Sequence, residues 1–414
     1  MTYIKPEAAS NQTSLIKDIL EQGTEAAQRC NWLEVSHQLS LLPRTSNKTK
    51  LFNLNSRDWH TAFDLALKML IEADFQHKWE ITKLLPLFGT GIIDPLSNLV
   101  LEETVASEVR WFICQVLGNF PQQKVVLTLV ALLQQTSDSE LIEIAGKTLI
   151  KVGDRAVAAL VDLLEQPEHR LLAVKSLSYI RTTQTITPLL SIATQATQSE
   201  PELCAIAIKA LGSFHDPRVA PVLIEALENK ASAVRKEAAI ALGFRPDLCQ
   251  KLNLVNRLQP LLFDLDLEVC SQAAIALSRM KQPDATKALY EVLRASTTPV
   301  MLKLEIVKAL GWSEISSGID YLQQALHQAN ETITQEIIVV LGRITVAQLK
   351  PQCAQVLIDF WQQQQPTSSQ TKQVLATSLG ELRDKSAQPV LEQLAADGDR
   401  KVKLHALAAL KKLG

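Results

Sequence analysis

The sequence predicts an all-α solenoid, because one short phrase returns along most of the chain at a nearly constant spacing. The phrase is Val234-Arg-Lys-Glu-Ala-Ala-Ile-Ala-Leu-Gly243, and related versions end at Gly212, Gly311 and Gly342. A step of 31 residues separates Gly212 from Gly243, and the same step separates Gly311 from Gly342. A repeat of this length is typical of stacked helix pairs, each of which buries its apolar face only against its neighbours.

The composition agrees with packed helices. Hydrophobic residues make up 47% of the chain and charged residues 21%, as in ordinary folded proteins. Only 14 glycines and 17 prolines occur in 414 residues, and aromatic residues are 5%, which favours helices packed through Ala and Leu over a β-sandwich. The net charge is −2 and no block rich in Lys and Arg occurs, so nucleic acid is not an expected partner.

Each repeat unit reads as two helices joined by a short turn. Apolar residues recur at helical spacing from Leu203 to Leu211, and Gly212 then stands where we expect a left-handed residue to end the helix. Asp216-Pro217 begins the second helix of the unit. About ten such pairs are expected, and the final unit supplies only its first helix. Their first helices are predicted to begin near Glu80, Val109, Ile142, Arg170, Leu203, Val234, Val269, Leu302, Ile333, Thr371 and Val402.

The first 75 residues do not keep the phrase. Helices are predicted at about 14–29, 32–42 and 57–73, with a polar loop at 46–49. We therefore predict a divergent helical N-terminal cap at 1–75 and a repeat solenoid at 76–414. A separate binding module in place of the cap is the alternative.

No motif of catalysis or metal binding is apparent. The six cysteines are scattered without a Cys-x-x-Cys pair, and no His-Glu-x-x-His, Gly-x-Ser-x-Gly or phosphate-binding glycine loop occurs. We therefore predict no catalytic residue, no metal site and no cofactor. The polar start and the lack of 18 uninterrupted apolar residues predict a cytoplasmic chain without membrane insertion.

The phrase resembles the short HEAT-like repeats of the phycobilisome-lyase family. The resemblance is carried by the phrase itself, by Asp216-Pro217, and by the pattern Pro-x-Leu-Ile-x-Ala-Leu at 221–227, and it covers roughly residues 80–414. The units are shorter than the about 40–47 residues of ordinary HEAT repeats. The family includes the E- and F-type bilin lyases of cyanobacteria as well as HEAT-repeat scaffolds, one of which binds an A-type iron–sulfur carrier.

This resemblance implies two functions from different classes. The first, which we favour, is a non-catalytic interaction scaffold, with an A-type iron–sulfur carrier as one implied partner. The alternative is a bilin lyase or chromophore chaperone, which would bind a bilin transiently together with a phycobiliprotein subunit.

The resemblance also implies that the phrase helices line a concave groove, with the third, fourth and seventh positions of the phrase pointing into it. Trp111 and Phe112 are then candidate aromatic anchors for a partner or a flat chromophore. The alternative is that both pack inward, near Trp79 and Phe88. The predicted groove residues are Trp111, Phe112, Gln115, Ile206, Lys209, Lys236, Glu237, Ile240, Glu305, Lys308 and Glu336.

The second position of the phrase is basic in several units, and this predicts a structural ladder. HEAT-type arrays use this position to bind turn acids, here Glu108, Asp264 or Asp266; the alternative is a basic surface for carboxylates. The ladder residues are Arg110, Arg235, Lys303 and Lys372. Cys204 and Cys270 occupy the same position two repeats apart, roughly 20 Å at the usual spacing of packed helices, which is too far to share one metal ion.

Overall fold

The computed structural model describes residues 6–45, 51–195 and 200–413, and these form an array of helices. Within those ranges there is no β-strand, only an isolated bridge between Arg44 and Phe52. The predicted polar loop at 46–49 lies outside the described residues. The chain divides into two compact units, 1–188 and 189–414. The predicted fold class, an all-α solenoid of helix pairs, is confirmed.

Unit 1 begins with three helices that precede the repeats. They pack against one another, and both α2 and α3 also pack against α4. Whether 1–75 forms a domain of its own remains a prediction. The helices of this unit are α1 (Pro6–Gln28), α2 (Trp32–Leu41), α3 (Ser56–Glu72), α4 (Phe75–Leu84), η1 (Leu85–Ile92), α5 (Ile93–Leu101), α6 (Ser107–Leu117), α7 (Gln123–Gln135), α8 (Ser139–Val152), η2 (Gly153–Ala156), α9 (Val157–Leu163), α10 (Pro167–Tyr179) and η3 (Thr183–Thr185). The boundary with unit 2 lies within α11 (Ile186–Gln195).

Unit 2 contains six helix pairs and a final single helix. The pairs are α12 (Pro201–Leu211) with α13 (Val219–Ala226); α14 (Ser232–Gly243) with η4 (Pro246–Leu248), α15 (Leu254–Leu258) and η5 (Gln259–Phe263); α16 (Leu267–Met280) with α17 (Pro283–Arg294); α18 (Val300–Trp312) with α19 (Ser316–Leu326); α20 (Glu331–Gly342) with η6 (Ala347–Leu349) and α21 (Lys350–Gln364); and α22 (Ser369–Leu382) with η7 (Lys385–Ala387) and α23 (Gln388–Ala395). The final helix is α24 (Arg400–Leu413).

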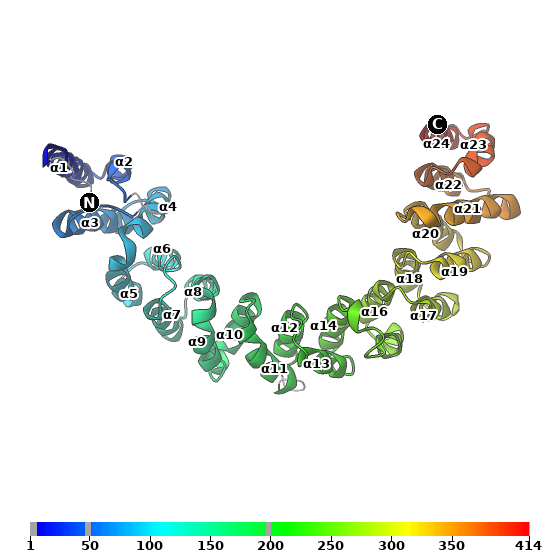
Figure 1. Ribbon diagram of the computed structural model, residues 1–414, viewed down its shortest axis with the longest axis horizontal. Coiled ribbons are helices and arrows are strands. Elements are labelled where there is room, and N and C mark those ends of the chain that lie inside the picture. The colour runs from blue at the N-terminus through cyan, green and yellow to red at the C-terminus, as the bar shows by residue number, and fades with distance from the viewer. Residues whose placement is uncertain (1–5, 46–50, 196–199, 414) are drawn as a thin grey trace. The chain divides into compact units, whose positions relative to one another are not determined.

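The helices of each unit form two layers. The first helix of every pair, here called the A helix, carries the phrase and packs on the A helices of the neighbouring pairs, from α4 to α10 in unit 1 and from α12 to α24 in unit 2. The second helices, the B helices, form the other layer (Figure 1). Within unit 2 the A layer lies on the concave side (Figure 1). The phrase therefore builds one continuous layer in each unit.

Most A helices begin two or three residues before their predicted starts. Helix α4 begins at Phe75, five residues before its predicted start at Glu80. Polar capping accounts for several of these starts, since α8, α16 and α20 begin directly after Asp138, Asp266 and Asn330, whose side chains accept hydrogen bonds from the first-turn N–H groups. Asp74 caps α4 in the same way. The starts were predicted from the spacing of apolar residues, and a polar capping residue does not contribute to that spacing.

The glycine at the tenth position of the phrase has a different role from the one predicted. Gly212 has φ −56°, so the expected left-handed helix end is wrong. The glycine instead permits close approach of consecutive A helices, because a Cβ on Gly212 would lie 2.7 Å from the Cβ of Ala241, and one on Gly342 would lie 2.5 Å from the Cβ of Ser378. Among the described glycines, positive φ occurs at Gly89 and Gly153.

The segment Phe75–Leu101 is the one helical run of the described chain that is long and apolar enough to cross a membrane. This is weak evidence, because core helices of soluble proteins pass the same test and 44% of its most apolar stretch is buried inside the structure. The run is also divided at Gly89, where φ is 76°, into the helix pair of the first repeat. Here it packs as repeat structure; the absence of membrane insertion remains a prediction.

Candidate interaction surface on the A helices

The predicted groove residues lie on the free face of the A helices, with one exception. Lys209 is exposed and nine others are partly exposed, from Trp111 on α6 to Glu336 on α20. We call the free face of α12, α14, α16, α18, α20, α22 and α24 in unit 2 the A-face, made by the third, fourth and seventh positions of the phrase. That these residues bind a partner remains a prediction.

Phe112 is the exception, and its predicted place in the groove is corrected by the structure. Its side chain is fully buried, with its ring centroid 5.2 Å from that of Phe75 and 6.4 Å from that of Trp79. The stacking of α4 on α6 covers this side of the helix, so Phe112 is a core residue. Trp111, its neighbour, is partly exposed and lines a cavity of about 550 Å³ with Phe75, Glu108, Glu140, Glu143, Ile144 and Lys147.

Three charged residues of the A-face take part in ion pairs, whereas Lys209, Glu237 and Glu336 form none within the described residues. Lys236 Nζ lies 2.8 Å from Glu268 Oε2, and Lys308 Nζ lies 2.8 Å from Glu305 Oε1. These hydrogen bonds raise the pKa of both lysines, with a smaller contribution from neighbouring Glu237 to Lys236 and from Glu336 to Lys308. The face therefore combines ion-paired and unpaired charges with the half-buried side chains of Ile206 and Ile240.

The second position of the phrase forms cross-repeat ion pairs in two units. Arg235 binds Asp264 in bidentate fashion, with Nε–Oδ2 at 2.6 Å and Nη2–Oδ1 at 2.8 Å, and Lys372 Nζ lies 2.7 Å from Asp397 Oδ2. Lys303 lines a cavity of about 340 Å³ and has no ion pair in the described part of the chain. Glu108, the acid expected to bind the ladder in unit 1, pairs with Lys78 and not with Arg110. Its Oε2 lies 2.5 Å from Lys78 Nζ.

Lys78 is a structural residue that the sequence reasoning missed. Its side chain is buried, and it stands on α4, the A helix that precedes the A helix of Arg110. The predicted start of this helix at Glu80 excluded Lys78 from the register of the phrase. Recognising Asp74 as a capping residue would have included it.

In four repeats the second-position side chain donates a hydrogen bond to a backbone carbonyl at the end of the preceding B helix or in the turn that follows it. Carbonyls at a helix end lack partners within the helix, so an outside donor stabilises them. A thiol can supply this bond as an arginine does, which explains cysteine here without any role in metal binding. The four contacts are Arg110 Nε to Val100 O (2.8 Å), Cys204 Sγ to Ala193 O (3.5 Å), Arg235 Nη1 to Asn229 O (2.7 Å) and Cys270 Sγ to Asp264 O (3.2 Å).

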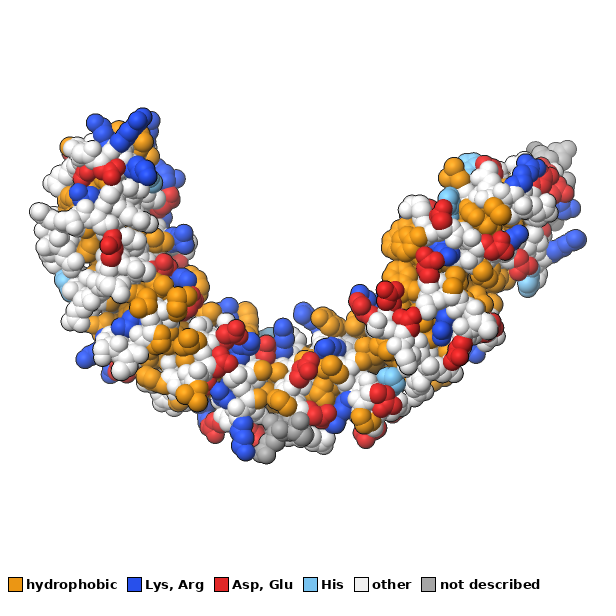
Figure 2. Space-filling view, turned by 180° about the vertical axis from the view of Figure 1, so that it is seen from behind, with side chains coloured by type: hydrophobic (Ala, Val, Ile, Leu, Met, Phe, Trp, Pro, Cys, Tyr) orange, Lys and Arg blue, Asp and Glu red, His pale blue; other side chains and the backbone are white. Residues whose placement is uncertain are grey.

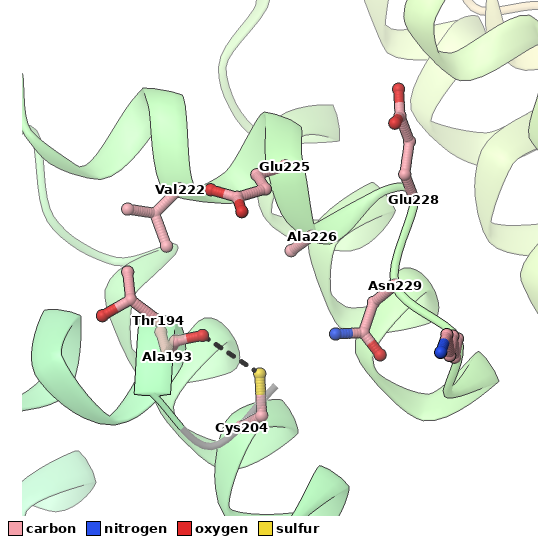
Figure 3. A pocket seen from close by; sticks show the side chains of 9 residues that line it. Ala193, Thr194, Cys204, Val222, Glu225, Ala226, Glu228 and Asn229 are labelled. Atoms are coloured by element: carbon pink, nitrogen blue, oxygen red, sulfur yellow. Dashed lines mark hydrogen bonds between the residues drawn. The ribbon is translucent and has the colours of Figure 1, made fainter. Parts of the chain in front are cut away.

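Cys204 also forms part of a small pocket on the B side of unit 2. The pocket is about 220 Å³ and is lined by Glu225 of α13 and by Asn229, and Figure 3 shows the sulfur directed at the Ala193 carbonyl. Burial raises the pKa of the Cys204 thiol, which keeps it protonated and unreactive at neutral pH. The parts of the chain that the structure describes contain no group of three or more His, Cys, Asp or Glu able to hold a metal ion.

A large cavity on the A-face lies at the end of unit 2, and we call it the terminal pocket. It has a volume of about 770 Å³ and is formed by side chains of α20, α22 and α24. Thr377 Oγ1 and His405 Nδ1 lie 2.9 Å apart across two of these helices. The lining residues are Val339, Gly342, Arg343, Ser369, Gln370, Gln373, Val374, Thr377, Ser378, Glu381, Asp399, Arg400, Lys401 and His405. Gln373, Val374, Thr377 and His405 occupy the same phrase positions as the predicted groove residues, so the register of the phrase could have identified them.

The Arg235–Asp264 pair makes stability depend on pH. The hydrogen bond from Arg235 holds the pKa of Asp264 below its ordinary value of 3.8, so the pair stabilises the fold above that value and is lost as pH falls through the lower folded pKa. We expect Asp264→Asn to lower the free energy of unfolding by about 1.5 kcal/mol at pH 7. Urea titrations should show that the two proteins differ less in free energy of unfolding as the pH falls below 3.8. A difference that stays constant with pH would contradict the assignment.

Comparison with known sequences agrees with this architecture. The profile of HEAT repeats matches residues 93–178 and 186–250. The fold is that of a HEAT-repeat solenoid. No protein of curated function matches the chain.

Solved HEAT-type solenoids show the same fold at low sequence identity. A Kap121p mutant is 12% identical, with a TM-score of 0.56, over 99% of this chain and 54% of that one. Importin beta is 14% identical, with a TM-score of 0.53, over 94% of this chain and 59% of that one. Kap95p, in a structure describing its binding of RanGDP, is 12% identical, with a TM-score of 0.51, over 87% of this chain and 55% of that one. The chain thus spans somewhat more than half the length of these proteins, and the likeness concerns the fold alone.

Proposed function

We propose that this protein is a non-catalytic scaffold that binds a partner protein along its A-face. One observation carries the proposal: seven consecutive A helices of unit 2 present accessible side chains at equivalent positions, and this surface ends in the terminal pocket. HEAT-repeat solenoids are typical of protein-interaction scaffolds, because stacked repeats create long binding surfaces.

The chemistry of the A-face supports a protein partner. Ile206, Ile240, Ile275 and Val339 are half-buried and stand among charged side chains, of which Lys236, Glu305 and Lys308 are ion-paired. An apolar patch with polar surroundings is the usual composition of a reversible protein interface. Binding would remove these apolar side chains from water, which favours association.

The resemblance of the phrase supports two identities for the partner. An A-type iron–sulfur carrier would dock on the A-face without contributing the scaffold's thiols to its cluster. A phycobiliprotein subunit with its bilin is the alternative, in which the protein would be a bilin lyase or chaperone that binds the pigment transiently. Both identities place the protein in the cytoplasm.

The test is capture of the partner from an extract of the source cells by the tagged protein, with mass spectrometry and a visible spectrum of the eluate. We expect one protein at near-equal stoichiometry, and Ile206→Arg/Ile240→Arg should reduce its recovery at least about tenfold. Leu265→Arg is the matched control, because Leu265 is fully exposed in the turn before α16 and recovery should not change.

The outcomes separate the proposals. A colourless eluate with an iron–sulfur carrier supports the scaffold and identifies its partner, whereas a phycobiliprotein with a bilin band supports the lyase or chaperone. Recovery that is unaffected by the two arginine substitutions would show that the A-face is not the binding surface.

A further inference from the structure

The residue that follows the phrase, at its eleventh position, extends the A-face at the C-terminal ends of the A helices. It stands four residues after the seventh position, one helical turn further along the same face. The described eleventh-position residues of unit 2 are Ser213, Phe244, Arg279, Trp312, Arg343, Glu381 and Lys412.

Eleventh-position side chains of adjacent repeats touch one another. The guanidinium carbon of Arg279 lies 4.1 Å from the centroid of the Phe244 ring, and Lys412 Nζ lies 2.5 Å from Glu381 Oε1. In unit 1, Lys151 Nζ donates to Asn119 Oδ1 at 3.0 Å. The eleventh positions of neighbouring repeats are therefore within reach of a single extended ligand.

Four consecutive members of this series combine exposed aromatic and arginine side chains, and we call Phe244, Arg279, Trp312 and Arg343 the arginine–aromatic row. Phe244 is 61% exposed and Trp312 is 54% exposed, although both are large apolar residues. Arg279 and Arg343 are also exposed, and neither forms an ion pair within the residues that the structure describes. Tryptophan and arginine are the residues most enriched at the energetic centres of protein interfaces.

The spacing of the row matches one particular peptide conformation. Adjacent packed helices lie about 8–10 Å apart. A polyproline II helix advances about 9 Å in each turn of three residues, so its side chains at i, i+3 and i+6 lie on one face with nearly the same spacing. Three successive repeats can therefore each contact one side chain of such a segment.

The order of residue types in the row specifies the side chains of the ligand. Trp312 stands between Arg279 and Arg343, and the guanidinium groups can each bind a carboxylate through two parallel hydrogen bonds. We propose that the row binds a polyproline II segment of a partner protein with Asp or Glu at i and i+6 and an apolar residue at i+3. This inference rests on the proposed function and names the chemistry of its partner.

The surroundings of Arg343 favour an acidic peptide over nucleic acid. Arg343 also lines the terminal pocket, where Arg400 and Lys401 add positive charge, and Figure 2 shows Lys and Arg side chains gathered over α24 at the upper left. The carboxylates of Glu381 and Asp399 line the same pocket. These carboxylates would repel the regularly spaced phosphates of a nucleic acid. A peptide with two acidic residues at the spacing of Arg279 and Arg343 would avoid this repulsion.

The test uses the full-length protein and a fluorescently labelled peptide, acetyl-Glu-Pro-Pro-Leu-Pro-Pro-Glu-amide, followed by fluorescence anisotropy. We expect saturable binding, weakened at least about tenfold by Arg279→Gln, by Arg343→Gln and by Trp312→Ala. Lys287→Gln on α17 and Phe263→Ala, both at exposed positions outside the row, are matched controls that should leave binding unchanged. Peptides with Gln in place of Glu, or with the second Glu moved to i+5, should bind at least about tenfold more weakly.

Three results would overturn the inference: no binding of the peptide at about 1 mM, equal binding of the peptide with shifted spacing, or affinity unchanged in all three row variants. Tighter binding of a mixed-sequence single-stranded oligonucleotide, lost in the same variants, would assign the row to nucleic acid and also overturn it. If the peptide fails while partner capture still depends on Ile206 and Ile240, the proposed function survives and this inference alone falls.

Discussion

Leu242→Asp is expected to unfold the seams around α14 while leaving the far end of unit 2 folded. Leu242 is fully buried in the A layer, and α14 packs against both α12 and α16. The substitution removes a buried leucine and places a carboxylate in an apolar seam, which together cost at least about 5 kcal/mol. In a solenoid the loss should stay local, because each repeat is stabilised only by its neighbours.

Hydrogen exchange followed by mass spectrometry measures where protection is lost. We expect fast exchange from α12 to α16, with α22 and α24 still protected. The control is Leu265→Asp, since Leu265 is fully exposed and its substitution should change neither protection nor stability. Simultaneous loss of protection in every helix of unit 2 would contradict nearest-neighbour stabilisation.

The layered architecture was predictable from the phrase because every repeat meets the same physical requirement. Each A helix packs between two others, so alanine and leucine recur at the same positions of every repeat. The period of this pattern therefore predicts that the helices stack. Several predicted starts were late because the helix begins at a polar capping residue such as Asp266, which carries no apolar signal.

Features that depend on the distance between helices were not predictable from one helix at a time. Phe112 occupies a groove position of the phrase, yet Phe75 of the preceding A helix covers it. Lys78, which binds Glu108 of the next repeat, escaped detection because its helix was predicted to start at Glu80. The arginine–aromatic row was missed because the phrase was read as ending at its glycine, although the same face continues for one more residue.

The second large effect concerns the tenth position, where Gly342→Ala is expected to destabilise the seam between α20 and α22. The added Cβ would lie 2.5 Å from the Cβ and 2.7 Å from the Cα of Ser378. Since the backbone of α22 cannot move aside like a flexible side chain, the two helices must separate. Overpacking of this kind costs typically about 1–3 kcal/mol, and more where backbone must shift, whereas alanine regains about 1 kcal/mol of helix propensity. With the cost at the upper end of this range, we expect a net loss of about 2 kcal/mol.

The matched control is Gly398→Ala, because a Cβ at Gly398 meets open space and the residue has no positive φ. Its unfolding midpoint in urea should be unchanged or slightly raised, since alanine reduces the freedom of the unfolded chain. A Gly342→Ala protein as stable as this control would mean that the A helices shift apart at little cost. The tenth-position glycine would then not be required for packing, and the constant spacing on which the arginine–aromatic row depends would lose its physical basis.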